Sequence, residues 1–214
     1  MRTTLLAIAL TSLSACAVPF SEMQSARLAG VGRSEITPTY SMVRAPLEEG
    51  GTGSVQTQFG AQAAYGLTKN LDLRLRYERI ALSELVDEEG SGSGTNILAI
   101  GPKFPLVRDR IALFVPIGLG FGGGIKSSET VQVHPTVLLT LPVGKAIDIN
   151  SSLKALIPLS DKGGETLVAV NLGLGISTAD RKWTVRPEVG VLRKPNESGH
   201  FRHFSIGLTR GFGR

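Results

Sequence analysis

The sequence predicts an all-β protein, a closed antiparallel up-and-down transmembrane β-barrel of about ten strands. Two observations lead to this fold class: apolar and polar residues alternate with period two in segment after segment, and tight turns alternate with longer polar links between the segments. A third observation is that charge is confined to one face of the alternating segments, while the apolar face carries almost none. In a strand, such alternation places the two residue classes on opposite sides of the sheet.

Residues 1–15 have the features of a signal peptide, with a positive charge at Arg2 followed by a short apolar stretch. Leu13-Ser14-Ala15-Cys16 comes next and resembles a lipobox, after which bacterial lipoproteins are cut and diacylated on the cysteine thiol. The resemblance implies a covalent diacylglycerol and an acyl chain such as palmitate on Cys16, and no other cofactor. The alternative is an ordinary signal peptide cut at the same place. Because Cys16 is the only cysteine, an intrachain disulfide is excluded.

The strands follow from residue 33 onward, and segment 70–81 gives the clearest alternation. Leu71, Leu73 and Leu75 form one face of this segment, while Asp72 and Arg74 belong to the other. The same pattern, read in chain order, predicts strands over 33–43, 54–66, 70–81, 95–104, 109–121, 130–141, 146–158, 166–177, 182–192 and 201–212. Each is about the 9–11 residues that a tilted strand needs to cross a bilayer. Eight or twelve strands remain alternatives if the segments 33–43 or 95–104 behave differently.

The connections predict which end of the barrel faces which side of the membrane. Tight turns lie at 66–70, 106–109, 142–145 and 177–181, and longer links at 44–54, 82–94, 122–129, 159–165 and 193–200. Short periplasmic turns alternating with longer outer loops are typical of outer-membrane barrels. We therefore expect both chain ends in the periplasm, with residues 16–31 as a lipidated periplasmic tether, a lipid on Cys16 in the inner leaflet of that membrane, and residues 32–214 as the barrel.

The polar face favours a membrane barrel over a soluble one. A charged residue at the bilayer midplane costs about 2–4 kcal/mol for Lys or Arg, so a charge-free face suits contact with lipid. Four aromatic residues mark the predicted periplasmic strand ends on that apolar face: Tyr65, Phe104, Trp183 and Phe212. The charged and histidine side chains expected to line the lumen are Asp72, Arg74, Arg76, Glu78, Lys103, His134, Asp148, Lys154, Arg186 and Glu188.

The segment 32–212 resembles bacterial outer-membrane β-barrel proteins in pattern. Its last strand, Ser205 to Phe212, is similar to the C-terminal signal read by the barrel-assembly machinery, although Arg210 stands where a hydrophobic residue is usual. The resemblance implies the outer membrane of a Gram-negative bacterium, with a lipid anchor at Cys16. Its expected partners are outer-membrane lipid, lipopolysaccharide and that assembly machinery. The mild excess of 23 basic over 18 acidic residues shows no basic stripe, so we expect no nucleic-acid binding.

The predicted function is non-enzymatic: a structural, surface-interaction or porin-like small-solute permeation role, with residues 82–94 and 122–129 as loops for an external ligand. Lumen ion pairs are expected between Glu78 and either Arg74 or Arg76, between Arg186 and the neighbours of Glu188, and between Asp148 and Lys154. One alternative is a membrane-embedded hydrolase acting on lipid or lipopolysaccharide, because His203 and Ser205, with Glu188 on the adjacent strand, resemble the His-x-Ser pair of lipid A 3-O-deacylases. Another is a tethered soluble lipid-binding barrel with an apolar-lined cavity. The histidines show no metal-ligand spacing.

Overall fold

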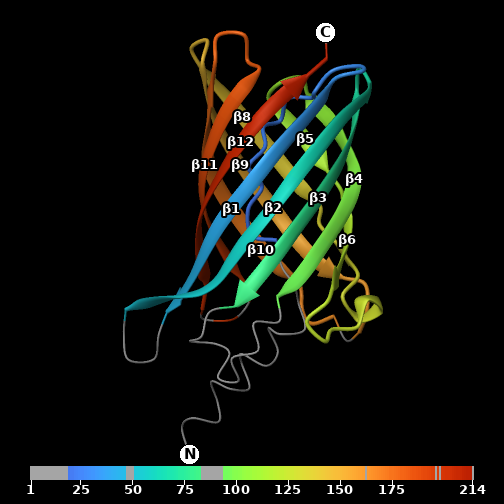
Figure 1. The fold of residues 1–214 in the computed structure, drawn as a ribbon, viewed down its shortest axis with the longest axis vertical. Coiled ribbons are helices and arrows are strands. Elements are labelled where there is room, and N and C mark those ends of the chain that lie inside the picture. The colour runs from blue at the N-terminus through green and yellow to red at the C-terminus, as the bar shows by residue number, and fades with distance from the viewer. Residues whose placement is uncertain are drawn as a thin grey trace, which may run out of the picture.

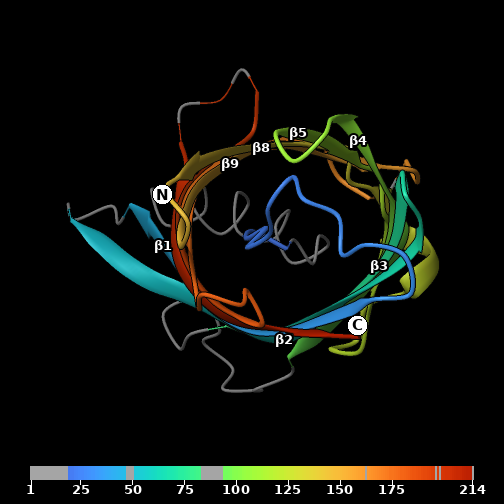
Figure 2. The same ribbon diagram turned by 90° about the horizontal axis from the view of Figure 1, so that it is seen from above.

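The computed structural model describes residues 19–46, 51–82, 94–161, 163–195, 197 and 199–213. Their strands form a single antiparallel barrel, seen from the side in Figure 1 and down its axis in Figure 2. The elements are β1 (Ser34–Pro46), β2 (Thr52–Thr68), β3 (Leu71–Leu82), β4 (Thr95–Val107), β5 (Ile111–Phe114), β6 (Ile117–Phe121), the 3-10 helix η1 (Ser127–Glu129), β7 (Gln132–Val133), β8 (Thr136–Val143), β9 (Ile147–Pro158), β10 (Leu167–Ser177), β11 (Trp183–Arg193) and β12 (Phe201–Phe212).

The sheet closes because β1 pairs with β12 as well as with β2. Every other strand also pairs with both of its neighbours around the ring, so no edge is left open. Closure satisfies the backbone hydrogen bonds that lipid cannot satisfy. The predicted fold class, a closed antiparallel barrel of ten strands, is confirmed.

Two of the ten crossings are each divided into two shorter strands by a proline. Pro116 separates β5 from β6, and Pro135 separates β7 from β8. Proline has no N–H to donate to a ladder, so the regular pairing stops at these positions. The carbonyls still accept: the N–H of His134 donates to Pro116 O at 2.9 Å, and that of Ala155 to Pro135 O at 3.0 Å. The wall is therefore continuous through both breaks.

The two faces of the wall have the polarity of a membrane barrel. Large apolar side chains such as Leu73, Leu172 and Phe204 point outward and are exposed, whereas the charged side chains on the opposite face are buried inside. The alternative of a soluble barrel with an apolar-lined cavity is therefore wrong, because the apolar face points away from the interior. On the outward face, Arg210 stacks against aromatic rings, with its guanidinium carbon 4.7 Å from the Trp183 ring centroid and 5.1 Å from that of Phe212.

Short and long connections lie at opposite ends of the barrel, as Figure 1 shows. The turns β2–β3, β4–β5, β8–β9 and β10–β11 share one end with the start of β1 and the end of β12, and we call this the turn end. The longer connections share the other end, here called the loop end; η1 lies in one of them. No helix in the described part of the chain is long and apolar enough to span a membrane.

Candidate functional site

The lumen of the barrel is occupied by the chain itself. Residues 19–29, which we call the plug, run through the interior before the chain turns into β1, and Figure 2 shows this dark-blue segment inside the ring. We predicted residues 16–31 as a periplasmic tether, but residues 19–29 of this segment lie in the barrel. The physical reason is that the plug supplies backbone groups and a carboxylate to charged lumen side chains that would otherwise be buried without partners.

At the loop end the plug is held by an apolar cluster. Phe20 packs among the buried side chains of Val43, Leu156 and Leu192, with Phe201 at the rim of the cluster. The rings of Phe20 and Phe201 meet edge to face with centroids 5.9 Å apart, an arrangement favoured between aromatic side chains. All four neighbours of Phe20 belong to the loop ends of their strands, so Phe20 closes the lumen there.

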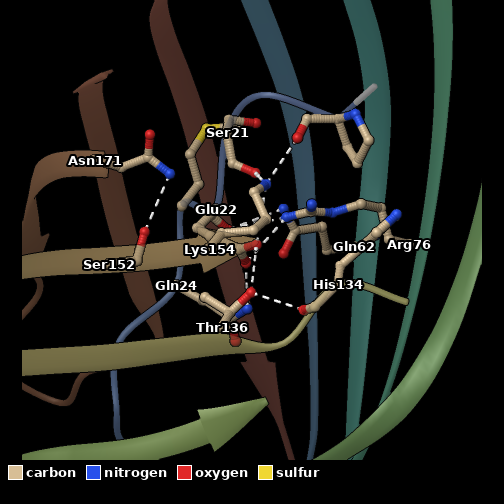
Figure 3. A network of polar contacts seen from close by, with 12 residues as sticks. Ser21, Glu22, Gln24, Gln62, Arg76, His134, Thr136, Ser152, Lys154 and Asn171 are labelled. Carbon is tan, nitrogen blue, oxygen red and sulfur yellow. Dashed lines mark hydrogen bonds and ion pairs between the residues drawn. The ribbon is translucent and has the colours of Figure 1, made fainter. Parts of the chain in front are cut away.

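At mid-height the plug contributes the carboxylate of Glu22, which is 1% exposed and meets two buried cations. Its Oε2 lies 3.2 Å from Arg76 Nη2, and its Oε1 lies 3.2 Å from Lys154 Nζ. Gln24 Nε2 also donates to Oε2 at 2.6 Å. Lys154 Nζ further donates to the carbonyls of Pro19 and Ser21 at 2.7 and 3.1 Å. Figure 3 shows Gln24, Arg76 and Lys154 gathered around Glu22.

Glu188 binds the same part of the plug through its backbone. Its two carboxylate oxygens accept hydrogen bonds of 2.7 Å from the N–H groups of Glu22 and Met23. Met23 has a φ of 45°, and a left-handed residue in this position turns consecutive N–H groups toward one anion. Glu188 therefore acts as the anion in a backbone nest, and its charge strengthens both bonds.

Toward the turn end, Lys103 and two aspartates hold the rest of the plug. Lys103 Nζ donates to the carbonyls of Ser25 and Arg27, both at 2.6 Å. The guanidinium of Arg27 forms a bidentate pair with Asp148, at 3.0 and 3.2 Å. The N–H of Ala29 then donates to Asp72 Oδ2 at 2.8 Å. The plug is thus bound along its whole length by side chains of the barrel wall.

No family model matches this chain, and no curated protein does. Among solved structures, an outer membrane channel from Pseudomonas putida F1 is similar, with a TM-score of 0.50 and 12% identity over 85% of this chain and 96% of that one. The KdgM porin has a TM-score of 0.44 and 12% identity, over 83% of this chain and 99% of that one. Ail, the attachment invasion locus protein of Yersinia pestis, has a TM-score of 0.40 and 13% identity, over 85% of this chain and 99% of that one. What the Pseudomonas putida channel shares with this chain is the barrel fold.

All ten side chains predicted to line the lumen are buried on the inner face: Asp72, Arg74, Arg76, Glu78, Lys103, His134, Asp148, Lys154, Arg186 and Glu188. Arg76 Nε lies 3.6 Å from Glu78 Oε1, as expected. The expected pair between Asp148 and Lys154 is absent among the described residues, where Asp148 contacts Arg27 and Arg181, and Lys154 contacts Glu22. Several charged side chains of the wall therefore pair with the plug instead of with one another.

The candidate catalytic residues form a hydrogen-bonded chain in the lumen. His203 Nδ1 lies 2.8 Å from Ser205 Oγ, and His203 Nε2 lies 3.0 Å from Asn171 Oδ1. Glu188, the acid expected beside them, instead holds the plug backbone. Ser205 is fully buried and the ring of Phe20 lies 6.2 Å from the His203 ring. The geometry of a serine, a histidine and an amide is present, but the plug covers it.

The remaining predicted sites fall partly outside the described residues. Cys16, the predicted lipid attachment point, lies outside them, as do residues 83–93 of the predicted loop 82–94. The predicted loop 122–129 is described and contains η1. Within the described ranges, no group of three or more His, Cys, Asp and Glu side chains is arranged to hold a metal ion.

The plug was missed because its residues show no period that marks an inserted segment. One signal was available: Lys154 is opposed on its two neighbouring strands by Thr136 and Ala169, neither of which is acidic. A buried lysine with no acidic partner across the sheet indicates that an anion comes from elsewhere in the chain. Glu22 is that anion.

Proposed function

We propose that this protein is an outer-membrane β-barrel lipoprotein of a Gram-negative bacterium, anchored through a lipid on Cys16, with a structural or surface-interaction role. Its outward apolar face and buried polar face support the membrane location, as does the complete closure of the sheet. The exposed face contacts outer-membrane lipid and lipopolysaccharide. The last strand, ending at the outward-facing Phe212, supports recognition by the barrel-assembly machinery.

The observation that carries the role is the occupation of the lumen by the plug. Small-solute permeation needs a continuous aqueous path, and the described residues fill the lumen section with Phe20, Glu22 and the groups that bind them. Withdrawing the plug would leave Arg76, Lys154 and Glu188 buried without their partners, which is costly. The barrel is therefore a closed scaffold that presents its loops, including residues 82–94 and 122–129, to an external ligand.

Gel mobility and conductance test this proposal together. Protein from isolated outer membranes is run with and without boiling, and a heat-modifiable band that survives carbonate extraction is expected. The purified protein is then added to planar lipid bilayers, where the wild type is expected to give no stable current steps. A variant carrying Glu22→Gln and Glu188→Gln, which loosens the plug, is expected to give transient openings. Stable wild-type currents would overturn the closed-scaffold role and favour permeation.

A membrane-embedded hydrolase is the second candidate, favoured by the chain of Ser205, His203 and Asn171 at 2.8 and 3.0 Å. A reactive serine is tested with a fluorophosphonate probe on the folded wild type and on the Ser205→Ala variant. Labelling that depends on Ser205 would support the hydrolase. Equal, background labelling of both proteins is the result expected for the closed scaffold.

A further inference from the structure

The direction in which the plug crosses the membrane follows from its contacts, taken in order. Phe20 packs against Phe201, the first residue of β12, at the loop end. Glu22 binds at mid-height to Lys154 and Arg76. Ala29 donates to Asp72, the second residue of β3, at the turn end. From residue 20 to residue 29 the chain therefore passes from the loop end of the barrel to its turn end.

The plug leaves the lumen at the turn end through a tight backbone contact. The N–H of Gly32 donates to Gly66 O at 2.9 Å, and the N–H of Gly66 donates to Arg33 O at 2.9 Å. Strand β1 begins directly afterwards at Ser34, opposite Phe212. The last residue of β12 and the first residue of β1 thus share the turn end, while Phe20 lies at the loop end.

The wall packs closely around the plug at two levels of the lumen. At the level of Phe20 the inward-facing neighbours Val43, Leu156 and Leu192 are 0%, 1% and 1% exposed. At the level of Glu22 the side chain of Lys154 is 0% exposed.

We propose that the plug is a membrane-crossing segment that delivers the N-terminal end of the mature chain to the cell surface. This rests on the outer-membrane location proposed above, in which the longer loops face outward. Cys16 precedes Pro19 by three residues, and a fully extended chain spans at most about 3.6 Å per residue, so Cys16 stays within roughly 11 Å of Pro19. A diacylglycerol on Cys16 then belongs to the outer leaflet, not to the inner leaflet that the sequence suggested.

Site-directed labelling with a membrane-impermeant maleimide tests the direction of threading. Three single-cysteine substitutions are made in the full chain: Val18→Cys, one position before Pro19 in the sequence, Ser128→Cys in η1 at the loop end and Lys145→Cys in the β8–β9 turn. Acylation blocks the Cys16 thiol, so each variant offers one free thiol. In intact cells we expect Val18→Cys to label as fully as Ser128→Cys, and Lys145→Cys to label only after the outer membrane is permeabilised.

Labelling of Val18→Cys only after permeabilisation, alongside Lys145→Cys, would overturn the proposal. Wild-type protein labelled in intact cells would mean that Cys16 is a free thiol at the surface, which supports the threading and contradicts the lipid. Each variant is also checked for its heat-modifiable band. Loss of that band in all variants and in the wild type would contradict the barrel proposal itself, so the two failures are distinguishable.

A second measurement uses no cysteine. An epitope tag inserted between Ala17 and Val18 is probed with antibody on intact and on permeabilised cells, and the same tag between Gly144 and Lys145 is the matched control. Antibody binding to the first tag in intact cells, without binding to the control tag, supports the surface location. The reverse pattern would contradict it.

Discussion

One carboxylate oxygen of Glu188 accepts a 2.7 Å hydrogen bond from the backbone N–H of Glu22, although the two residues are 166 positions apart. The second oxygen of Glu188 takes the next N–H, from Met23, at the same distance. A carboxylate that accepts hydrogen bonds from two backbone N–H groups forms strong, charge-assisted bonds. Replacing it by a neutral group weakens both bonds and lowers the stability of the folded protein. This contact joins the start of the described chain to one of its last strands, β11.

Replacing Glu188 by glutamine tests the importance of this contact. We expect Glu188→Gln to lower the free energy of unfolding by about 1.5–3 kcal/mol, because hydrogen bonds to a charged group are replaced by weaker neutral ones. The measurement is urea unfolding of the protein in lipid vesicles, followed by loss of the heat-modifiable band. Glu165→Gln, in an exposed loop pair with Lys194, is the control and should change stability far less. Equal effects would contradict the anchoring role.

Removing the Glu22 carboxylate should lower the free energy of unfolding more than Glu188→Gln does. Glu22→Ala leaves Lys154 buried without its anion and Arg76 with only the longer contact to Glu78, and breaking a buried ion pair in this way costs about 3–5 kcal/mol. The double variant Glu22→Ala with Lys154→Met removes one of the stranded charges and should recover part of the loss. Urea unfolding of the wild type, both single variants and the double variant gives the coupling energy. Additive effects would mean that Glu22 and Lys154 do not interact.

The lipid-facing surface makes a separate prediction. Leu172 lies mid-strand on β10 and is 54% exposed on the outward face, so Leu172→Arg should cost about 2–4 kcal/mol in a bilayer. Leu159→Arg is the matched control, since Leu159 is 57% exposed but follows β9 at the loop end, outside the apolar band. Arg74→Leu, on the inner face, should impair insertion less than Leu172→Arg. The fraction of heat-modifiable protein after refolding into vesicles is the measurement, and equal fractions would contradict the assignment of faces.

The exit of the plug depends on the absence of a side chain at Gly66. A Cβ built there would lie 1.9 Å from the carbonyl oxygen of Gly30, so Gly66→Ala must push the two backbones apart. Overpacking of this kind typically costs about 1–3 kcal/mol. Gly211→Ala is the control, because its Cβ would meet nothing nearer than 4.0 Å. Limited proteolysis of both variants should show new cleavage within residues 19–33 in Gly66→Ala alone; identical digests would show that the close approach is not required.

The strands were predictable because lipid and lumen impose opposite demands on alternate residues, and the alternation in segments such as 70–81 records this directly. The two broken crossings also had a local signal, since Pro116 and Pro135 each remove a donor from the middle of a strand. The closing pair of β1 with β12 follows once the remaining strands pair in sequence and lipid forbids open edges.

The plug was not predictable in the same way. Most of its bonds use its backbone, as where Lys103 binds the carbonyls of Ser25 and Arg27, and every residue type offers that group. Glu22 and Arg27 are the plug residues with charged side chains, and their partners come from strands far along the chain. The lumen pairs were therefore assigned to the nearest opposite charges, which gave Asp148 the wrong partner.

The threaded segment also constrains the order of assembly. Residues 19–33 continue without interruption into β1, and β1 carries the pairing with β12 that seals the ring. Because Glu22 is a buried charge bound by residues of several strands, the strands must assemble around this segment before the pairing of β1 with β12 completes the barrel. Opening the β1–β12 ladder would release the segment sideways from the lumen, so this one pairing retains the plug as well as closing the wall.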